Sequence, residues 1–588
     1  MLGSTIINQR QHVGLQKLSA LAAVAHSTLG PHKKYKFIQD EATGDSVLAS
    51  SCLRILDNLD VATCSVGQLV HETIRAHHEI YHTGSGCLLF FAGAWSQTAL
   101  SCLHQGIPAM HVVAAMIEGI EFCMDLCKKS NISFNKLFAL TWNHEKEALM
   151  DSKVCRGRRQ VKLSRHFYNT KTESIPVQEP RLPDVAHLAN RLSHGCDDGM
   201  HLVIQASQIQ LKATPNSAFD VTKVTTCMLP GLSEDLAHVV PGCVVLLNAE
   251  QTSVAHHMKD KPLNVVFILG DLSHTYRHLG LKKHAGVKHV SDQSGLSDLS
   301  KEEEWMEKVL RLLLQLQVDL VMVSGLVNEL VIQRCSQRRI LVVGKVRMFI
   351  LKEMANAAGA IMVTYATQLS KHCVGKNIQV SIWKEIYCHE GTPLTAVRVN
   401  VTGCTRFVTA VITSPVNGKL QALEDRFWAC AYRVHHALKD KAVLPGAGTV
   451  EMLCILHLKK KAEVQNPRNG ISASNPYISI VFNLLADSFT EYLSTVMANS
   501  TGISHVNART ALNQKLQDIN GISAEFSPLM LDSDESAPSY KVVDNFTVKQ
   551  ESWRRALDLV LLVFQTDAEI ITGVDKSKHD SQTDLMFL

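Results

Sequence analysis

The chain has 588 residues, of which 46% are hydrophobic and 19% are charged, and its net charge is +4. This composition suits large buried cores and excludes a disordered chain, while the length predicts about three or four domains. The small net charge does not favour nucleic-acid binding. The first ten residues lack the charged-then-apolar layout of a signal peptide, and the apolar stretches at 87–95 and 559–564 are too short to span a bilayer. We therefore expect a soluble, intracellular protein without membrane insertion.

The first 130 residues have the apolar periodicity of helices. Leu15, Leu18 and Ala22 recur at helical spacing and lead directly into a turn at Gly30-Pro31. Further helices are predicted at 66–80, 86–104 and 108–127, where Pro108 occupies an allowed first-turn position.

The middle of the chain changes to short apolar runs that are rich in β-branched residues. We predict strands at 244–247, 265–269, 318–323, 340–343 and 360–363. Amphipathic helices are predicted at about 302–317 and 346–358. Alternating strands and helices favour an α/β domain with buried parallel strands.

The end of the chain is again helical, because a wide apolar stripe recurs at helical spacing. The stripe consists of Trp553, Ala556, Leu557, Val560, Leu561 and Phe564. We expect the two helical chain ends to pack together, with a polar tail after Gly573.

Three polar segments interrupt these patterns. Residues 152–172 carry seven Lys or Arg and no acid, which is typical of a solvated loop or, less often, of a nucleic-acid site. Residues 532–536 form an acidic loop. The excursion at 274–301 has a basic face made of Lys282, Lys283, His284, Lys288 and His289, which suits an acidic partner.

The sixteen cysteines contain no CxxC pair and are scattered along the chain. Cys52, Cys87, Cys243 and Cys454 lie in apolar runs, which is typical of buried reduced thiols. Cys123 and Cys127 lie four residues apart on a predicted helix, but no second pair matches them, so core packing is favoured over a zinc site. The histidines at 77, 78 and 82 leave a metal-dependent hydrolase as one alternative function.

Two glycine-containing loops far apart in the chain resemble parts of one nucleotide pocket. Residues 29–38 read LGPHKKYKFI and resemble the LGPxGxxKxL phosphate loop of group II (TCP-1) chaperonins. Residues 443–451 read VLPGAGTVE and resemble the VVPGGGAxE turn of that family. Glycine-rich turns at helix N-termini present N–H groups to phosphate oxygens. The resemblance implies a degenerate nucleotide pocket made of Gly30, Pro31, Lys36, Gly84, Ser85, Gly446 and Gly448.

The same resemblance implies that the acidic residues of the family pocket are absent from this sequence. Lys33 stands where the phosphate loop has its second glycine, and the TNDG element falls on residues 49–52, which read ASSC. The GDGTT element, whose acid holds magnesium, falls on 81–86, with His82 or Thr83 at the acid position. Cys430 replaces the aspartate of the ERSLHDA-like helix that orients water. Because phosphoryl transfer depends on such groups, we expect no catalytic residue, no bound metal and at most weak ATP binding.

The family resemblance implies an α+β multidomain chaperonin subunit. Its helical equatorial domain would consist of 1–150 and 441–588, and its α/β apical domain of 223–394, where the family places its client contacts. The intermediate segments would be 151–222 and 395–440. The family also carries a lid in the apical domain, but the excursion at 274–301 is broken by three glycines, which disfavours a lid helix.

Further segments resemble the chaperonin-like branch of this family that is associated with Bardet–Biedl syndrome, notably 36–41, 88–95, 270–280 and 553–567. This resemblance implies an assembly factor for the BBSome, a ciliary trafficking complex. Its partners would be other chaperonin-like Bardet–Biedl proteins and cytosolic ring chaperonin subunits, with BBSome subunits as clients. The implied location is the cytoplasm with cilium or basal body association. An ATP-hydrolysing chaperonin subunit is the main alternative.

Overall fold

The computed structural model describes most of the chain. The described residues are 3–8, 12–41, 44, 46–59, 64–134, 137, 185–214, 218–259, 261–276, 294–387, 393–401, 407–465, 475–521 and 541–574. The basic segment 152–172, the acidic loop 532–536, residues 277–293 of the polar excursion and nearly all of the predicted polar tail lie outside them. The chain forms two compact units, unit 1 (residues 1–200 and 425–588) and unit 2 (residues 201–424).

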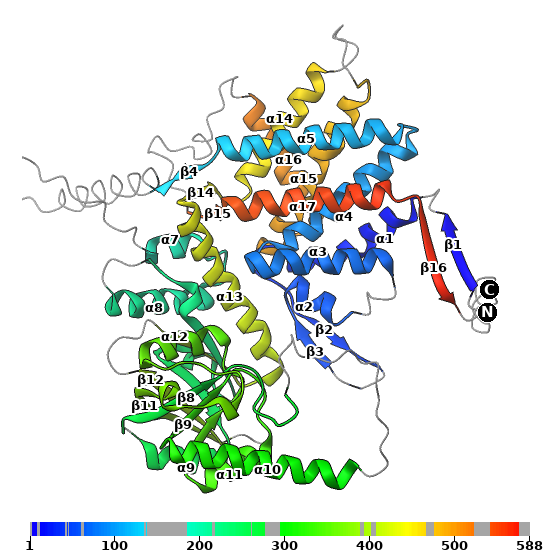
Figure 1. The fold of residues 1–588 in the computed structure, drawn as a ribbon. Coiled ribbons are helices and arrows are strands. Elements are labelled where there is room, and N and C mark those ends of the chain that lie inside the picture. Colours follow the sequence, from blue (N-terminus) through cyan, green and yellow to red (C-terminus); the bar gives the residue numbers. More distant parts are fainter. Residues whose placement is uncertain are drawn as a thin grey trace, which may run out of the picture. The chain divides into compact units, whose positions relative to one another are not determined.

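Unit 1 is mainly helical and contains both chain ends, as Figure 1 shows in blue and in yellow to red. Its helices are α1 (Val13–Ala22), α2 (Cys52–Asp57), α3 (Ser65–Tyr81), α4 (Ser85–His104), α5 (Ala109–Lys129), α7 (Val185–Arg191), the first turn of α8 (Asp197–Ala213), most of α13 (Asn417–Asp440), α14 (Thr449–Val464), α15 (Ile478–Thr501), α16 (His505–Gly521) and α17 (Phe546–Gln565). Its strands are β1 (Gly3–Asn8), β2 (Lys36–Gln39), β3 (Ser46–Ala49), β4 (Ile132–Ser133), β14 (Ala442–Pro445), β15 (Val543–Asn545) and β16 (Ala568–Val574).

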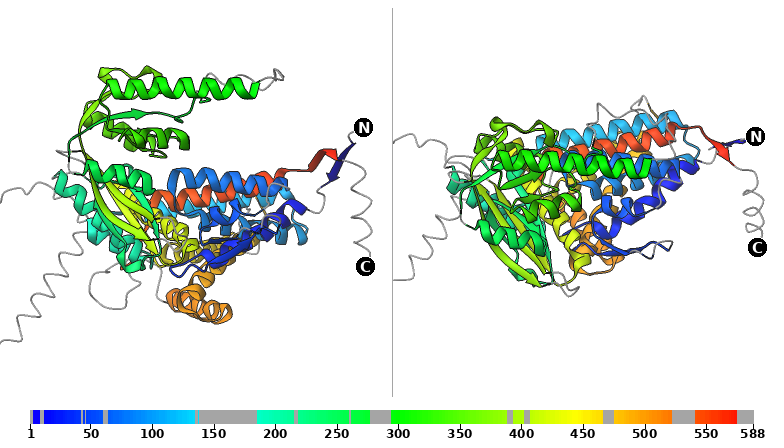
Figure 2. Two further views of the ribbon diagram at one scale, coloured as in Figure 1. Left: turned by 90° about the horizontal axis from the view of Figure 1, so that it is seen from below. Right: turned by 60° about the horizontal axis from the view of Figure 1, so that its bottom comes forward.

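The core of unit 1 is built from segments at both ends of the sequence. Helix α4 packs against α1, α15 and α17, and its Phe91 and Trp95 lie against Phe489 and Trp553. In Figure 2 the red helix α17 lies against blue helices from the N-terminal part of the chain, and α4 is among the helices that it contacts. The predicted packing of the two helical ends is therefore confirmed, as are the helices predicted at 66–80, 86–104 and 108–127. Pro108 precedes the first turn of α5 as its N-cap.

Helix α4 corrects one sequence expectation. It has 20 residues and is, among the described helices, the one that is long and apolar enough to cross a bilayer. The apolar stretch 87–95 alone is too short to cross a bilayer. The polar residues that follow it carry no charge, so the helix continues to His104. However, 67% of the apolar part of this helix is buried inside unit 1, as is typical of the central helix of a protein core.

Small antiparallel sheets complete unit 1. Strand β14 lies between β4 and β15 in a three-stranded sheet, so residues 132–133, 442–445 and 543–545 are held together. Strands β1 and β16 form one two-stranded ribbon, and β2 and β3 form another in which Phe37 pairs with Leu48.

Unit 2 contains a six-stranded sheet, in the order β10-β9-β8-β11-β12-β7, and a three-stranded sheet, in the order β5-β13-β6. The strands are β5 (Val224–Pro230), β6 (His238–Pro241), β7 (Cys243–Leu247), β8 (Leu263–Ile268), β9 (Leu320–Val323), β10 (Leu341–Val343), β11 (Gly375–Tyr387), β12 (Pro393–Val401) and β13 (Val408–Ser414). The helices are the rest of α8, α9 (Ala249–Met258), α10 (Ser294–Gln315), α11 (Glu329–Gln337) and α12 (Met348–Ala358).

Both faces of the six-stranded sheet are covered, which explains why its strands are continuous apolar runs. Val265 and Phe267 of β8 pack in a cluster with α9 and α12, whereas Val266 and Ile268 pack in a second cluster with α10 and α11. Successive residues of a strand point to opposite faces, so each face buries its own set.

Two details of the predicted sheet were wrong. The strands β8, β9 and β10 are parallel, but β7 pairs antiparallel with β12, so the sheet is mixed. The strand predicted at 360–363 is reduced to a single bridge between Val363 and Ile268. Val363 of that run is buried, and Ala360 and Met362 are partly buried against the core, whereas Ile361 is largely exposed.

Candidate functional site

The predicted phosphate loop follows α1 and a 3₁₀ turn (Ala23–Thr28) in unit 1. Gly30 has φ +85°, a conformation that favours glycine, and lies against Val496 and Ser500 of α15. The Asn499 side chain donates hydrogen bonds to the carbonyls of His26 and Leu29. These contacts fix the loop on the C-terminal half of α15.

Two more predicted segments converge on this loop. The Thr28 hydroxyl lies 3.1 Å from the Cys52 sulfur, at the end of the TNDG-like segment. Gly86, which follows Gly84 and Ser85 at the N-terminus of α4, faces Thr28, Leu29 and Cys52.

Gly84 has φ +83° and is packed so closely against Ser552 and Val548 of α17 that a side chain could not fit. Ser85 beside it is buried, and Lys36 begins β2, half-buried. The structure therefore brings together three of the five segments that the sequence assigned to one pocket.

The fourth segment joins β14 to α14. Gly448, with φ +82°, ends the turn and packs against Leu493 of α15, and Gly446 packs against the main chain of Val542. Since Leu493 lies on the same helix as the contacts of Gly30, both loops rest on α15. The glycines of the two loops thus have residues of α15 and Val542, just before β15, as their nearest neighbours.

Cys430, at the position of the family aspartate, is fully buried on α13. Its sulfur lies 3.7 Å from the main-chain oxygen of Cys196, which directly precedes α8, and it faces Gly199 in the first turn of α8. The neighbouring Asp425 is held by Ser51 and Arg54, at 3.1 and 3.3 Å, at the N-terminus of α2.

Lys33, which the resemblance aligns with the second family glycine, interacts electrostatically with groups of the same region. Its side chain is half-buried, and burial followed by the positive charge of Arg433 lowers the pKa of its ammonium group. The next largest influences are the sulfurs of Cys196, Cys52 and Cys430. The cation therefore lies within electrostatic reach of three thiols.

His82, which the resemblance aligns with the magnesium acid, is held by ring stacking. His82 ends α3 in a left-handed conformation, and its ring stacks on Tyr432 of α13 with 3.9 Å between centroids and 23° between planes. Thr83 uses its carbonyl oxygen to accept a hydrogen bond from His77 Nε2 at 3.0 Å. The loop between α3 and α4 thus closes onto α13 through an aromatic contact.

The residues at these positions do not fit a magnesium-bound nucleotide. Magnesium requires oxygen ligands, usually carboxylates, and a buried thiol or a stacked imidazole cannot replace them. Lys33 adds a side chain where the phosphate loop needs close backbone approach.

The His77, His78 and His82 region does not form a metal site in the described part of the chain. No group of three or more His, Cys, Asp or Glu residues there is arranged to hold a metal ion. Burial, followed by the charge of Arg555, lowers the pKa of His77 to about 4, and its Nε2 is engaged by Thr83. The rings of His78 and His82 meet edge to face.

A buried ion cluster beside the Gly446–Gly448 turn was missed by sequence reasoning. Lys549 of α17 contacts Glu451 of α14 and Asp544 of β15, both at 2.6 Å, and His194 contacts Asp544 at 3.1 Å. Although burial opposes the charged form, Asp544 and Glu451 raise the pKa of Lys549 well above its usual range. Glu451 was visible in the VLPGAGTVE segment, but nothing in the sequence identified Lys549 as its partner.

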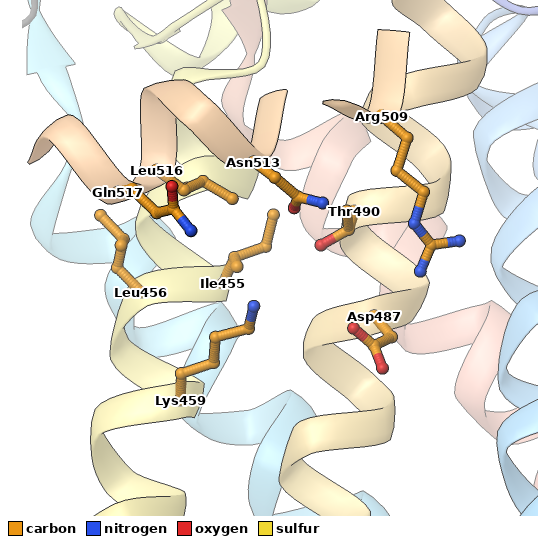
Figure 3. A pocket seen from close by; sticks show the side chains of 9 residues that line it. All are labelled: Ile455, Leu456, Lys459, Asp487, Thr490, Arg509, Asn513, Leu516 and Gln517. Atoms are coloured by element: carbon orange, nitrogen blue, oxygen red, sulfur yellow. The ribbon is translucent and has the colours of Figure 1, made fainter. Parts of the chain in front are cut away.

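Two cavities lie in unit 1. One, of about 400 Å³, is lined by Ser51, Arg54, Asp57, Arg75, His78 and Asp425 among others. The other, of about 290 Å³, lies between α14, α15 and α16, and Figure 3 shows the side chains of Lys459, Asp487 and Arg509 around it. Neither is lined by the loop glycines or by Cys430.

A family model, the TCP-1/cpn60 chaperonin family, matches residues 171–573. The chain belongs to this chaperonin family. It is 34% identical to "Chaperonin-containing T-complex member BBS12" of Homo sapiens over 100% of both chains, and 32% identical to the Mus musculus protein of that name over 98% of both. It is also 22% identical to "T-complex protein 1 subunit gamma" of Arabidopsis thaliana, over 96% of this chain and 92% of the relative.

Proposed function

We propose that this chaperonin is an assembly factor that binds partner chaperonin subunits and client proteins, without efficient ATP hydrolysis of its own. The observation that carries the proposal is the replacement of both family acids, by Cys430 and by His82 or Thr83, with Lys33 in place of the second loop glycine. A subunit that cannot turn over nucleotide contributes through its surfaces.

The names of the relatives support a more specific role. Through the resemblance to the Bardet–Biedl branch, we infer that the clients are BBSome subunits. The partners are other chaperonin-like Bardet–Biedl proteins and cytosolic ring chaperonin subunits, in the cytoplasm and near the cilium or basal body. We further infer that unit 1 contains the equatorial domain and that unit 2 contains the client-facing apical domain.

Purified chain that is free of ring chaperonin is expected to release phosphate from ATP no faster than a buffer blank. Restoring acids with Cys430→Asp together with His82→Asp or Thr83→Asp should give at most weak activity, because Lys33 still crowds the loop. Adding Lys33→Gly to these variants tests whether the Lys33 side chain blocks the loop. Calorimetry with ATP, with and without magnesium, separates nucleotide binding from hydrolysis. Robust hydrolysis by the unmodified chain would favour the alternative, an ATP-dependent chaperonin subunit.

The two ribbons of unit 1 supply surfaces for partner subunits. Each has two strands among the described residues, so each leaves strand edges that another chain could extend. Phe37 in the β2–β3 ribbon is 69% exposed, although large apolar side chains are usually buried. An exposed aromatic beside an open strand edge is typical of an interaction site.

Replacing Phe37 with serine is therefore expected to lower recovery of ring chaperonin subunits in pull-downs by about tenfold, as for loss of one central interface aromatic. The matched control is Val506→Ser on α16, where the side chain is 72% exposed but lies on a helix instead of a strand edge. Equal recovery with both variants would exclude the β2–β3 ribbon as the contact.

A further inference from the structure

Cys196 occupies the position that favours a reactive thiolate at the start of a helix. It immediately precedes the 17-residue helix α8, and its carbonyl accepts a hydrogen bond from Met200 N at 2.9 Å, so it is the capping residue. Unpaired N–H groups and the helix dipole at this end stabilise negative charge on sulfur. Cys196 is 6% exposed, so only small reagents can reach it.

A second thiol lies against it. Cys430, on α13, is separated from Cys196 by 234 positions in sequence, yet its thiol donates to the Cys196 carbonyl oxygen at 3.7 Å and its side chain also interacts with the Cys196 thiol. Gly199 lies beside this contact, since a Cβ there would be 3.4 Å from the Cys430 sulfur.

Cations surround the pair. Arg433 is 5% exposed and fixed by hydrogen bonds to the carbonyls of Leu192 and Ser193, at 3.0 and 2.7 Å. Lys33 and Arg426 also act on the Cys196 sulfur. The nearby acids, Asp197 and Asp198, are exposed to solvent in the first turn of α8.

The two thiols have different environments. The interaction with the Cys430 side chain lowers the pKa of Cys196 below its usual range, against the effect of burial and with support from Arg433 and Lys33. The same interaction, together with burial, raises the pKa of the Cys430 thiol. Because Cys196 also lies at the N-terminus of α8, we assign it as the nucleophile and Cys430 as the resolving thiol.

A second contacting pair in the same unit has the opposite environment. Cys454 and Cys123 are hydrogen-bonded to each other in the apolar core. Burial raises the pKa of Cys454 well above its usual range. Such thiols are inert, so this pair is a natural control within the chain.

We propose that Cys196 and Cys430 form a reversible dithiol site that small hydroperoxides oxidise to a disulfide. The Cys196 thiolate attacks one peroxide oxygen, an S–O bond forms, the O–O bond breaks and water leaves after taking one proton, which gives a sulfenic acid. The Cys430 sulfur then attacks the Cys196 sulfur, and its proton leaves with the hydroxyl group as a second water. The two sulfurs lose two electrons, and hydrogen peroxide is reduced to two waters.

The disulfide would covalently join the start of α8 to α13. It would also remove the thiolate that balances Lys33 and Arg433, so oxidation changes the charge of the degenerate pocket. The inference rests on the geometry of the thiols and cations and does not depend on the proposed assembly function.

The test uses the purified, reduced full chain treated with hydrogen peroxide, followed by alkylation and peptide mass spectrometry. A linked Cys196–Cys430 peptide that dithiothreitol removes is expected, while Cys123 and Cys454 stay alkylatable after unfolding. With Cys430→Ala, dimedone should label Cys196 as the trapped sulfenic acid, and Cys196→Ser should abolish both products. Cys454→Ser is the matched control and should leave the linked peptide unchanged.

A measurement on the unmodified chain removes any dependence on the folding of variants. Iodoacetamide at pH 6 is expected to alkylate Cys196 about tenfold faster than Cys64, which caps α3 in the same way and is more exposed. Lys33→Met should reduce this difference. The proposal is overturned if Cys196 reacts no faster than Cys64, or if peroxide gives no linked peptide at a dose that oxidises Cys64.

Discussion

Replacing Lys549 with methionine is expected to lower the free energy of unfolding of unit 1 by about 3–5 kcal/mol, because it leaves buried carboxylates without their cation. Glu451 is 1% exposed, so water has little access to its carboxylate once the cation is removed. Urea unfolding followed by tryptophan fluorescence measures the change, since Trp95 and Trp553 are both buried in the core of unit 1.

The control for this variant is Lys461→Met. Lys461 contacts Glu118 at 3.4 Å with both side chains partly exposed, and such surface pairs contribute less than about 1 kcal/mol. Adding Glu451→Gln and Asp544→Asn to Lys549→Met should recover part of the loss. If Lys549→Met unfolds at the same urea concentration as the unmodified chain, the ion cluster does not stabilise unit 1.

The ion cluster also predicts a pH dependence. Burial opposes ionisation of Asp544, but the charges of Lys549 and His194 outweigh it and lower the pKa of this carboxyl below its unfolded value. A carboxyl with a lowered folded pKa contributes stability above its unfolded pKa of about 3.9 and loses it as pH falls further. Unfolding measured from pH 7 to pH 3 should show this loss below about pH 4, and Asp544→Asn should reduce it.

Replacing Phe564 with alanine is expected to cost about 3–5 kcal/mol of stability, because a large side chain leaves a cavity in the core. Phe564 is 6% exposed and lies near His12, before the start of α1, with 5.6 Å between ring centroids. For a protein that acts by association, this loss should appear as low abundance in cells and weak recovery of chaperonin partners.

Leu562→Ala is the matched control for Phe564→Ala. It lies two residues earlier on α17 but is 51% exposed, so its truncation should change stability by less than about 0.5 kcal/mol. Leu561, expected from the sequence to be in the apolar stripe, is only partly buried, and its truncation should have an intermediate effect. Equal stability of the Phe564 and Leu562 variants would contradict the placement of α17 in the core.

Sequence periodicity predicted the helices of unit 1 well because their buried faces are long and regular. The prediction at 66–80 differs from α3 by one residue at each end. In unit 2, sequence periodicity did not reveal β11 and β12, which lie between β8 and β7 in the sheet. The mixture of parallel and antiparallel strand pairs was therefore not predicted. Helix α11 was missed as well, because nine residues carry too little periodicity to be distinguished from a loop.

The candidate site was predictable in part. Short motifs identified the loops at Gly30, Gly84 and Gly446, whose sequence is dictated by backbone conformation. The family resemblance placed Lys33 and Cys430 in one pocket, but side-chain contacts between distant segments have no local signature, so Cys196 could not be added to them in advance. The binding of nucleotide at these loops stays a prediction.

The interleaved core of unit 1 has a consequence for synthesis on the ribosome. Unit 2 is encoded by one continuous stretch and can fold as soon as residue 424 has emerged, whereas α4 must wait for α15 and α17 to cover it. Because domains fold as they are completed, the apolar faces of α1, α4 and α5 remain uncovered while more than half of the protein is translated. An mRNA truncated before the codon for Phe546 would therefore yield a folded unit 2 attached to an incomplete unit 1 with exposed apolar surface. We expect quality-control proteases to degrade this product.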